Sequence, residues 1–159
     1  TVEKFGKTAE LLGELPKESP FFYLMETARN LCLVLEKKAD LGREIRLAYS
    51  QEDKETLQEI ANIKIPVLLQ RLQDFYQSFR TQWNLENKSF GFEVQTVRIG
   101  GLLQRLKDVQ EILNAYLREE IPGIAELNEP QKAFHYFEQN EIRSLNYNLW
   151  TDIVSPSKI

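Results

Sequence analysis

The sequence predicts an all-α protein, an antiparallel bundle of three long helices with a short N-terminal helix and an irregular aromatic C-terminal tail. Apolar residues recur every three or four positions through three long stretches, which is the spacing of one helix face. With 159 residues and 42% hydrophobic content, the chain is long and apolar enough to form one domain with a core. We therefore expect a single helical domain over residues 1–159, made of a bundle (1–121) and a tail that wraps it (122–159).

The short N-terminal helix is expected over residues 1–15. Its apolar positions are spaced by three and four, and they are Val2, Phe5, Ala9 and Leu12. Residues 16–20, PKESP, form a connector in which Pro20 suits the start of the next helix.

The first long helix is expected over residues 21–49. Its predicted core face comprises Phe21, Leu24, Ala28, Leu31, Leu35, Gly42, Ile45 and Tyr49. Gly42 is expected to allow close packing or a slight bend. Residues 50–53, SQED, supply a turn and an acidic N-terminal cap for the helix that follows.

The second long helix is expected over residues 54–83. Its predicted core face comprises Leu57, Ile60, Ala61, Leu68, Leu72, Phe75, Phe79 and Trp83. Pro66 lies inside this helix, where its missing N–H removes a hydrogen bond to residue 62 and predicts a kink. The alternative is two helices broken near Ile65.

The third long helix is expected over residues 92–118 and has the most regular repeat. Its apolar positions are Ile99, Leu102, Leu106, Val109, Leu113 and Tyr116, the spacing of a bundle seam. The Gly100-Gly101 pair costs about 1 kcal/mol per residue in helix propensity. Close approach of another backbone is the compensation that we expect.

The tail from residue 122 onward loses the helical period. Residues 132–138 are expected to form a short strand or helix, and residues 146–154, NYNLWTDIV, an extended segment. This tail is expected to wrap the bundle or to return toward a neighbouring domain.

Composition and charge exclude several classes of partner. The net charge of −4 disfavours nucleic acid and an acidic membrane surface, and no apolar run has the about 18 residues needed to span a bilayer. The lone cysteine, Cys32, lies in the apolar run LCLVL and is expected to be buried, which favours the cytoplasm. The start at Thr1, with Met25 the only methionine, suggests a domain excised from a larger protein.

The residues that could carry chemistry do not form a recognisable catalytic or metal-binding pattern. Glu119-Glu120 and Glu52-Asp53 are expected to be a solvated helix end and a helix cap. His135 is the only histidine, and no HExxH, GxSxG or phosphate-loop motif is present. We therefore assign no catalytic, cofactor-binding or metal-binding residue, and we expect no cofactor.

Four aromatic residues lie in or beside breaks in the helical pattern: Trp83, Phe90, Phe92 and Trp150. Aromatic faces can bind sugars, but packing in the core or between domains is the favoured interpretation, since aromatic residues dominate buried interfaces.

The stretch NKSFGFEVQTVRIGGLLQRL, residues 87–106, resembles the C-terminal helical domain of a bacterial branch of the glycoside hydrolase family 20 β-N-acetylhexosaminidases. The preceding WNLEN, the order of the long helices and the late NLWTDIVSPS are also similar to these domains. The resemblance implies a parent enzyme that hydrolyses terminal N-acetylhexosamine residues with an adjacent Asp-Glu pair on a (β/α)8 barrel.

This chain has no Asp followed by Glu and is shorter than a barrel of about 250 residues. The resemblance therefore implies a non-catalytic accessory domain that stabilises the catalytic barrel of the same polypeptide, shapes its cleft or forms a homodimer contact. The expected contact residues are Trp83, Asn87, Phe90, Phe92, Glu93, Gln95 and Arg98. The alternatives are a free-standing helical interaction protein without enzymatic activity and a small stand-alone enzyme.

Overall fold

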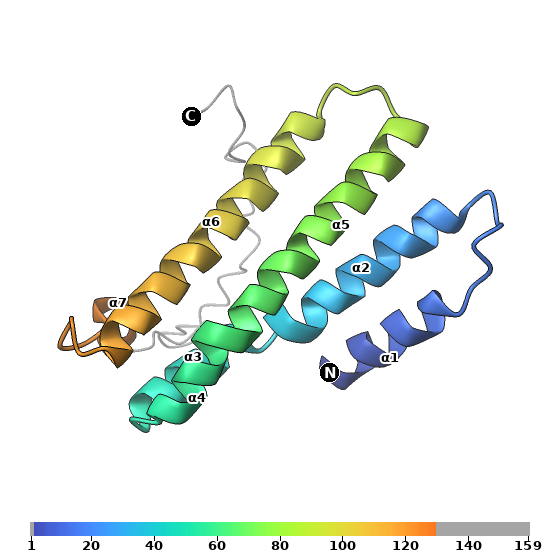
Figure 1. The fold of residues 1–159 in the computed structure, drawn as a ribbon. Coiled ribbons are helices and arrows are strands. Elements are labelled where there is room, and N and C mark those ends of the chain that lie inside the picture. Colours follow the sequence, from blue (N-terminus) through green and yellow to red (C-terminus); the bar gives the residue numbers. More distant parts are fainter. Residues whose placement is uncertain (1, 130–159) are drawn as a thin grey trace, which may run out of the picture.

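The computed structural model describes residues 2–129, and every regular element in this part is helical (Figure 1). The elements are α1 (Val2–Gly13), α2 (Phe22–Lys38), α3 (Leu41–Ser50), α4 (Lys54–Glu59), the π-helical turn η1 (Ile60–Lys64), α5 (Ile65–Glu86), α6 (Phe92–Leu117) and α7 (Ala125–Asn128). The predicted all-α class with three long helices is confirmed. The expected strand or helix over residues 132–138, the extended segment over 146–154, and His135 and Trp150 lie outside the described residues.

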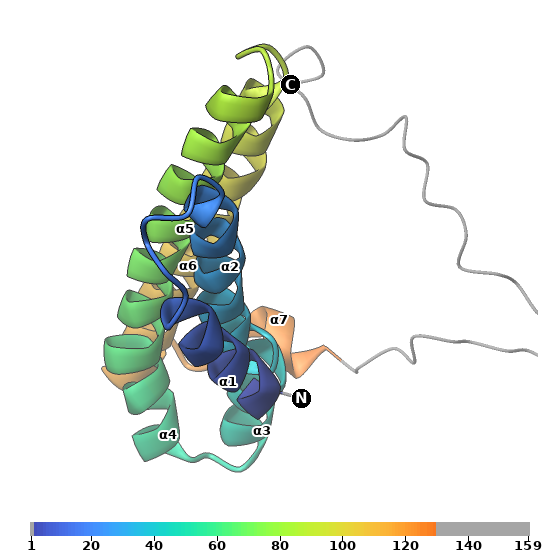
Figure 2. The same cartoon turned by 90° about the vertical axis from the view of Figure 1, so that its right-hand side faces the viewer.

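The long helices lie side by side in the order α6, α5, α2, with α1 on the outer side of α2 (Figures 1 and 2). Neighbouring long helices run antiparallel. α3 and α4 lie at the lower end of this row in Figure 1, and α7 lies on one side of it in Figure 2. No helix in residues 2–129 combines the length and the hydropathy needed to cross a bilayer.

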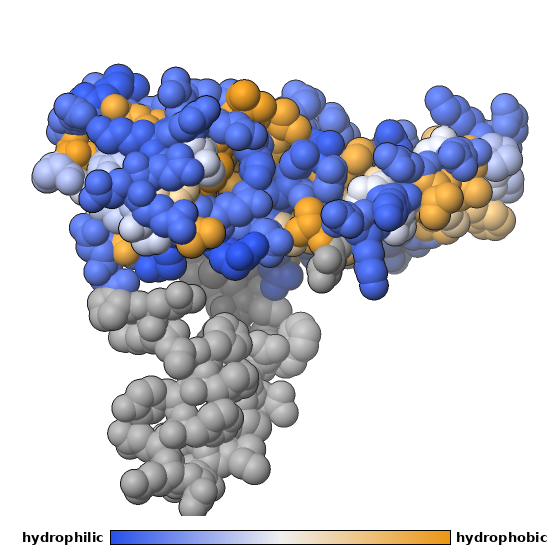
Figure 3. Space-filling view, turned by 90° about the horizontal axis from the view of Figure 1, so that it is seen from below, coloured by the Kyte–Doolittle hydropathy of each residue, from blue (hydrophilic) through white to orange (hydrophobic). Residues whose placement is uncertain are grey.

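The core is concentrated at the lower end, where α3, α4, η1 and α7 close around α5 and α6. Its buried members are Val34, Leu41, Ile45, Ala48, Leu57, Ile60, Ala61, Ile65, Leu68, Leu72, Leu106, Leu113 and Ile124. The connection between α1 and α2, at the right in Figure 1, exposes Leu15 and Phe21, and Leu11 is exposed near the end of α1. Figure 3 shows scattered apolar patches on a mostly hydrophilic lower face.

The prediction of one helix over residues 21–49 is wrong, because the chain turns at Ala39 and Asp40 and forms α2 and α3. After the turn, the apolar face of α3 is buried in the core, with Leu41 and Ile45 among its members, and this burial favours the bent path. A sequence signal for this break exists, since Lys37 and Lys38 form the last turn of α2, where positive charge is favourable.

The predicted core face of α2 is also partly wrong. The buried residues of α2 are Thr27 and Val34, whereas Phe21 is 60% and Leu31 39% exposed. α2 lies between α1 and α5, so it has two packed sides, and a single apolar stripe does not describe it. Close packing at Gly42 is absent within residues 2–129, because a Cβ built there meets none of their atoms within 4 Å.

The region around Pro66 combines features of both predicted alternatives. The helical path continues from α4 to α5, but η1 changes its hydrogen bonds, and the N–H of Ile65 donates to the carbonyl of Ile60 five residues earlier. Pro66 then falls in the first turn of α5, where a missing N–H is tolerated. The predicted acidic cap is confirmed: Asp53 accepts hydrogen bonds from the N–H and the hydroxyl of Thr56 at 3.0 and 2.7 Å.

Helix α6 agrees with its prediction to within one residue at its C-terminal end, and it buries Phe92, Leu106 and Leu113. The expected approach of another backbone at Gly100 and Gly101 is absent from the described residues, since a Cβ on either glycine meets no atom within 4 Å. The pair therefore carries the helix-propensity cost of glycine with no packing gain in this part of the chain.

Replacing both glycines with alanine, Gly100→Ala/Gly101→Ala, is expected to stabilise the chain by about 1 kcal/mol per site. The added methyl groups meet no steric obstacle from the described residues, and both glycines have ordinary helical φ angles. Urea denaturation followed by circular dichroism measures the change. A destabilised double variant would show that a segment beyond the described residues lies against the glycine pair.

An ion pair ties α2 to α5 beside the core. The guanidinium of Arg71 donates from Nη1 to the carbonyl of Leu33 at 2.7 Å and to the carboxylate of Glu36. The hydrogen bond from Arg71 lowers the pKa of Glu36 below its ordinary value of 4.5. The ionised form of Glu36 is thus the one that the folded state stabilises.

Glu36→Gln is expected to destabilise the chain by about 1 kcal/mol at neutral pH, a loss that shrinks in acid. Because the pKa of Glu36 is lowered in the folded state, its contribution is present above pH 4.5 and is lost as pH falls through the lower folded value. Urea titrations of both proteins at pH 7 and near pH 3 measure this. A difference that stays constant with pH would contradict the assignment.

Candidate functional site

The expected contact residues gather at the end of the α5–α6 hairpin, around the turn formed by residues 87–91. Asn87 leaves α5 in an extended conformation, and Gly91 enters α6 with a φ of 94°, a left-handed conformation that glycine adopts without strain. The indole N–H of Trp83 donates to the carbonyl of Lys88 at 2.9 Å, and its ring lies 3.4 Å from the position of a Cβ on Gly91. A larger residue at position 91 would therefore disturb both the backbone and the indole.

A cluster of four aromatic rings fixes this turn: Tyr76, Phe79, Trp83 and Phe92. The ring of Phe92 lies 5.6 Å from Tyr76, 5.6 Å from Phe79 and 5.8 Å from Trp83. Phe92 is only 7% exposed. It faces the interior of the hairpin, so among the expected contact residues it is a support for the turn rather than a free surface.

The other expected contact residues differ in how far they are exposed. Phe90 is 87% exposed, and Asn87, Glu93 and Arg98 are also exposed. Gln95 is half-buried. Glu93 accepts a hydrogen bond from the N–H of Gly91 at 2.7 Å, which places its negative charge at the positive N-terminal end of α6.

Two features of the surface were not predicted. Leu85 is 63% exposed at the end of α5, close in sequence to the turn. The helical period contained the signal, because Leu85 falls outside the spacing of Leu72, Phe79 and Trp83 that faces inward.

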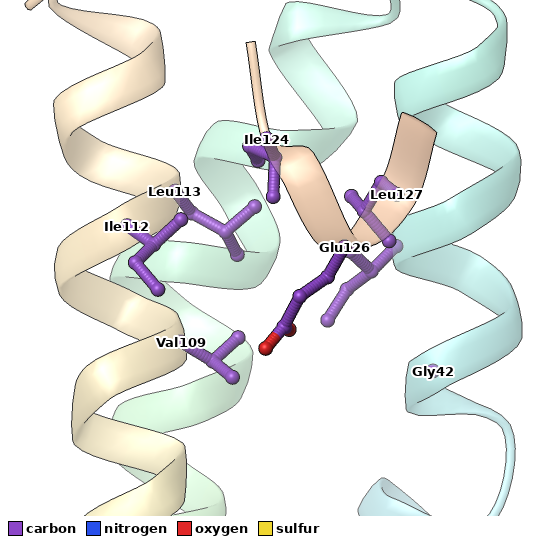
Figure 4. Close-up of a pocket in the computed structure, with 8 residues that line it drawn as sticks. Gly42, Val109, Ile112, Leu113, Ile124, Glu126 and Leu127 are labelled. Atoms are coloured by element: carbon purple, nitrogen blue, oxygen red, sulfur yellow. The ribbon is translucent and has the colours of Figure 1, made fainter. Parts of the chain in front are cut away.

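The second feature is a cavity of about 130 Å³ between α3, α6 and α7 (Figure 4). It is lined by Gly42, Ile45, Val109, Ile112, Leu113, Ile124, Glu126 and Leu127. Glu126 supplies the only charged group in this lining, and its carboxylate pairs with Arg105 at 2.7 Å. The walls bring no set of polar groups together. The cavity is therefore better suited to binding an apolar group than to catalysing a reaction.

Acidic residues that were considered for catalysis form ion pairs with nearby basic side chains. Glu119 pairs with Lys54 at 2.8 Å and Glu120 with Arg118 at 2.7 Å, and these hydrogen bonds lower the pKa of both carboxyl groups. A carboxyl group with a lowered pKa is a poor general acid, since it has no proton to donate near neutral pH. Asp53 has a lowered pKa for the same kind of reason, the hydrogen bond from the backbone of Thr56.

A metal centre is likewise not built by the residues that the structure describes. Between residues 2 and 129, no three side chains of His, Cys, Asp or Glu lie close enough together to hold a metal ion. In that same range, each buried side-chain nitrogen or oxygen atom has a hydrogen-bond partner. Two candidate sites therefore remain in the described residues: the exposed end of the α5–α6 hairpin, which the aromatic cluster holds in place, and the apolar cavity.

A sequence model described as the Glycoside Hydrolase 20C C-terminal domain matches residues 2–146. A comparison with curated proteins finds no match.

Proposed function

The chain belongs to the family of glycoside hydrolase 20C C-terminal domains, and we propose that it is the non-catalytic accessory domain of a β-N-acetylhexosaminidase. In this proposal a catalytic barrel in the same polypeptide hydrolyses terminal N-acetylhexosamine residues. The family match over residues 2–146 is the observation that carries the proposal. The chemistry of the described residues is compatible with it, because their acidic pairs cap or terminate helices.

We place the contact with the barrel at the exposed end of the α5–α6 hairpin, at Asn87, Phe90 and Arg98, with Leu85 beside them. Phe90 carries the strongest argument, since a side chain that is 87% exposed gains most from burial in an interface. The aromatic cluster holds the turn in place before any contact forms. Such preorganisation lowers the entropic cost of association.

Phe90→Ala in the full-length enzyme is expected to lower its melting temperature by about 2–4 °C, the shift that about 1 kcal/mol produces in a domain of about 150–250 residues. The same substitution in the 159-residue chain is expected to leave its melting unchanged, because Phe90 packs little within it. Calorimetry of both proteins, with kcat/KM on a chromogenic N-acetylhexosaminide, makes the comparison.

Arg98→Ala extends this test to a charged residue of α6, and Lys107→Ala is its matched control, an exposed cation farther along the same helix. We expect Arg98→Ala to change melting or kcat/KM of the full-length enzyme and Lys107→Ala to change neither. If Phe90→Ala and Arg98→Ala both leave the full-length enzyme unchanged, the hairpin end is not the contact. Glu93 is less suitable for this comparison, since it also caps α6.

A homodimer contact through the same surface is the alternative that we propose, and light scattering of the chain and of its Phe90→Ala variant would test it. A cytoplasmic location and a bacterial source also remain proposals. The first rests on the single cysteine, Cys32, which is free but half-buried rather than fully buried as expected.

A further inference from the structure

The cavity between α3, α6 and α7 has the size and lining of a site for an aromatic ring. Its volume of about 130 Å³ is close to the about 150 Å³ of an apolar protein cavity that binds benzene. Val109, Ile112 and Leu113 of α6 and Ile124 and Leu127 on the α7 side direct apolar side chains toward it in Figure 4. Such walls favour an apolar occupant, because an apolar group that fills the cavity removes their apolar surface from water.

The α3 side of this cavity has no side chain at one position. Gly42 lines the cavity, and a Cβ built on it meets nothing within 4 Å. Gly42 has no left-handed φ that would require glycine. The open space beside this residue therefore gives an outside group access to the apolar walls.

The last described residues of the chain lie beside this cavity. Leu127 lines it, and Arg46 donates from Nη1 to the carbonyls of Leu127 and Glu129, at 3.4 Å each. Tyr49 accepts a hydrogen bond from the N–H of Ile124 at 3.0 Å and donates to Asn128 at 2.9 Å. These bonds attach residues 124–129 to α3 beside the cavity.

The residues that follow carry suitable rings within reach. Residues 134–137 read Phe-His-Tyr-Phe. Phe134 comes five residues after Glu129, a span of about 17 Å at most for extended chain. The family match continues to residue 146, so the sequence pattern of the domain includes this segment.

We propose that a phenyl ring from residues 134–137 fills the cavity between α3, α6 and α7 and so attaches the C-terminal segment to the bundle. Phe134 and Phe137 suit it better than Tyr136, whose hydroxyl would require a polar partner. This attachment lies within the chain and does not depend on the parent enzyme or on the contact at the hairpin end.

Hydrogen exchange of the 159-residue chain, followed by mass spectrometry, tests the proposal at residues 131–146. Gly42→Leu places a branched side chain at the open side of the cavity, and Gly42→Ala is the matched control with a single methyl group. We expect protection of residues 131–146 in the wild type and in Gly42→Ala, and exchange at least about tenfold faster in Gly42→Leu, the change expected for losing one buried ring. Unchanged protection of α2, α5 and α6 in both variants confirms that the bundle remains folded.

Phe134→Ala and Phe137→Ala supply the reciprocal test. At least one of them should accelerate exchange of residues 131–146 and lower the melting temperature, whereas Tyr147→Ala, outside the matched region, should do neither. The proposal is overturned if residues 131–146 exchange at the rate of unstructured peptide in the wild type, or if Gly42→Leu leaves their exchange unchanged. A doubled molecular mass in light scattering, with no protection of residues 131–146, would assign the cavity to a second copy and also overturn it.

Discussion

Phe92→Ala is expected to lower the free energy of unfolding by about 3–4 kcal/mol, the cost of removing a buried phenyl ring and leaving a cavity. Phe92 is 7% exposed and contacts the rings of Tyr76, Phe79 and Trp83. Aromatic pairs of this kind contribute about 0.5–1.5 kcal/mol beyond the area they bury. The loss is expected to be large because Phe92 contacts all three of these rings, and Phe79 in turn packs against Phe75 and Trp83.

Phe90→Ala is the matched control, two residues away and of the same residue type. Phe90 is 87% exposed, so its truncation is expected to change stability by less than about 0.5 kcal/mol. Urea denaturation of both variants, monitored by circular dichroism and by fluorescence of Trp83 and Trp150, measures the difference. Equal destabilisation by the two substitutions would mean that Phe92 does not anchor the hairpin.

Leu68→Ala is expected to cost about 3 kcal/mol, within the usual range for a leucine in a rigid core. Leu68 is 0% exposed on α5, and it belongs to the core that α3, α4 and α7 close at the lower end of the molecule. Neighbouring buried residues such as Ile65 and Leu72 hold this site from the same helix. The surroundings are therefore expected to relax little into the space left by the side chain.

Leu85→Ala provides the control for this second prediction, because it makes the same chemical change on the same helix. Leu85 is 63% exposed, and its truncation is expected to cost less than about 0.5 kcal/mol. The slope of unfolding free energy with urea should stay unchanged in both variants. A cost below about 1 kcal/mol for Leu68→Ala would contradict the placement of α5 in the core.

The two predictions concern opposite ends of the α5–α6 hairpin. The core around Leu68 is closed by several short helices, whereas the cluster around Phe92 is made by the hairpin alone. If the hairpin end contacts a catalytic barrel, Phe92→Ala should also reduce the contribution that Phe90 makes to the stability of the full-length enzyme. The contact depends on the cluster for its geometry, so the two substitutions should not be additive in the full-length enzyme.

The candidate site was partly predictable because local chemistry determines part of it. The left-handed conformation at position 91 favours glycine. Glu93 lies at the start of α6, where a negative charge is favourable. These signals locate the turn and the start of the helix. They do not show which of Phe90 and Phe92 is buried. Both are phenylalanine, and only the packing of α5 against α6 buries Phe92.

The apolar cavity could not be predicted from any pattern. Gly42 on α3 is far in the sequence from Val109 on α6 and Leu127 on α7, and only the fold brings α3 against the other two. A similar limit explains the wrong core face of α2. The period of a helix shows which residues share a face, but the number of neighbours decides how many faces are buried.

By itself, the sequence determined the all-α class, the three long helices, the cap at Asp53 and the family resemblance, because these depend on local spacing and residue type. The tertiary structure decided the turn between α2 and α3, the open space that the described residues leave at the glycine pair, and the cavity beside α7. Each of these features depends on which helices lie against one another. Such contacts join residues distant in the chain, and no local period records them.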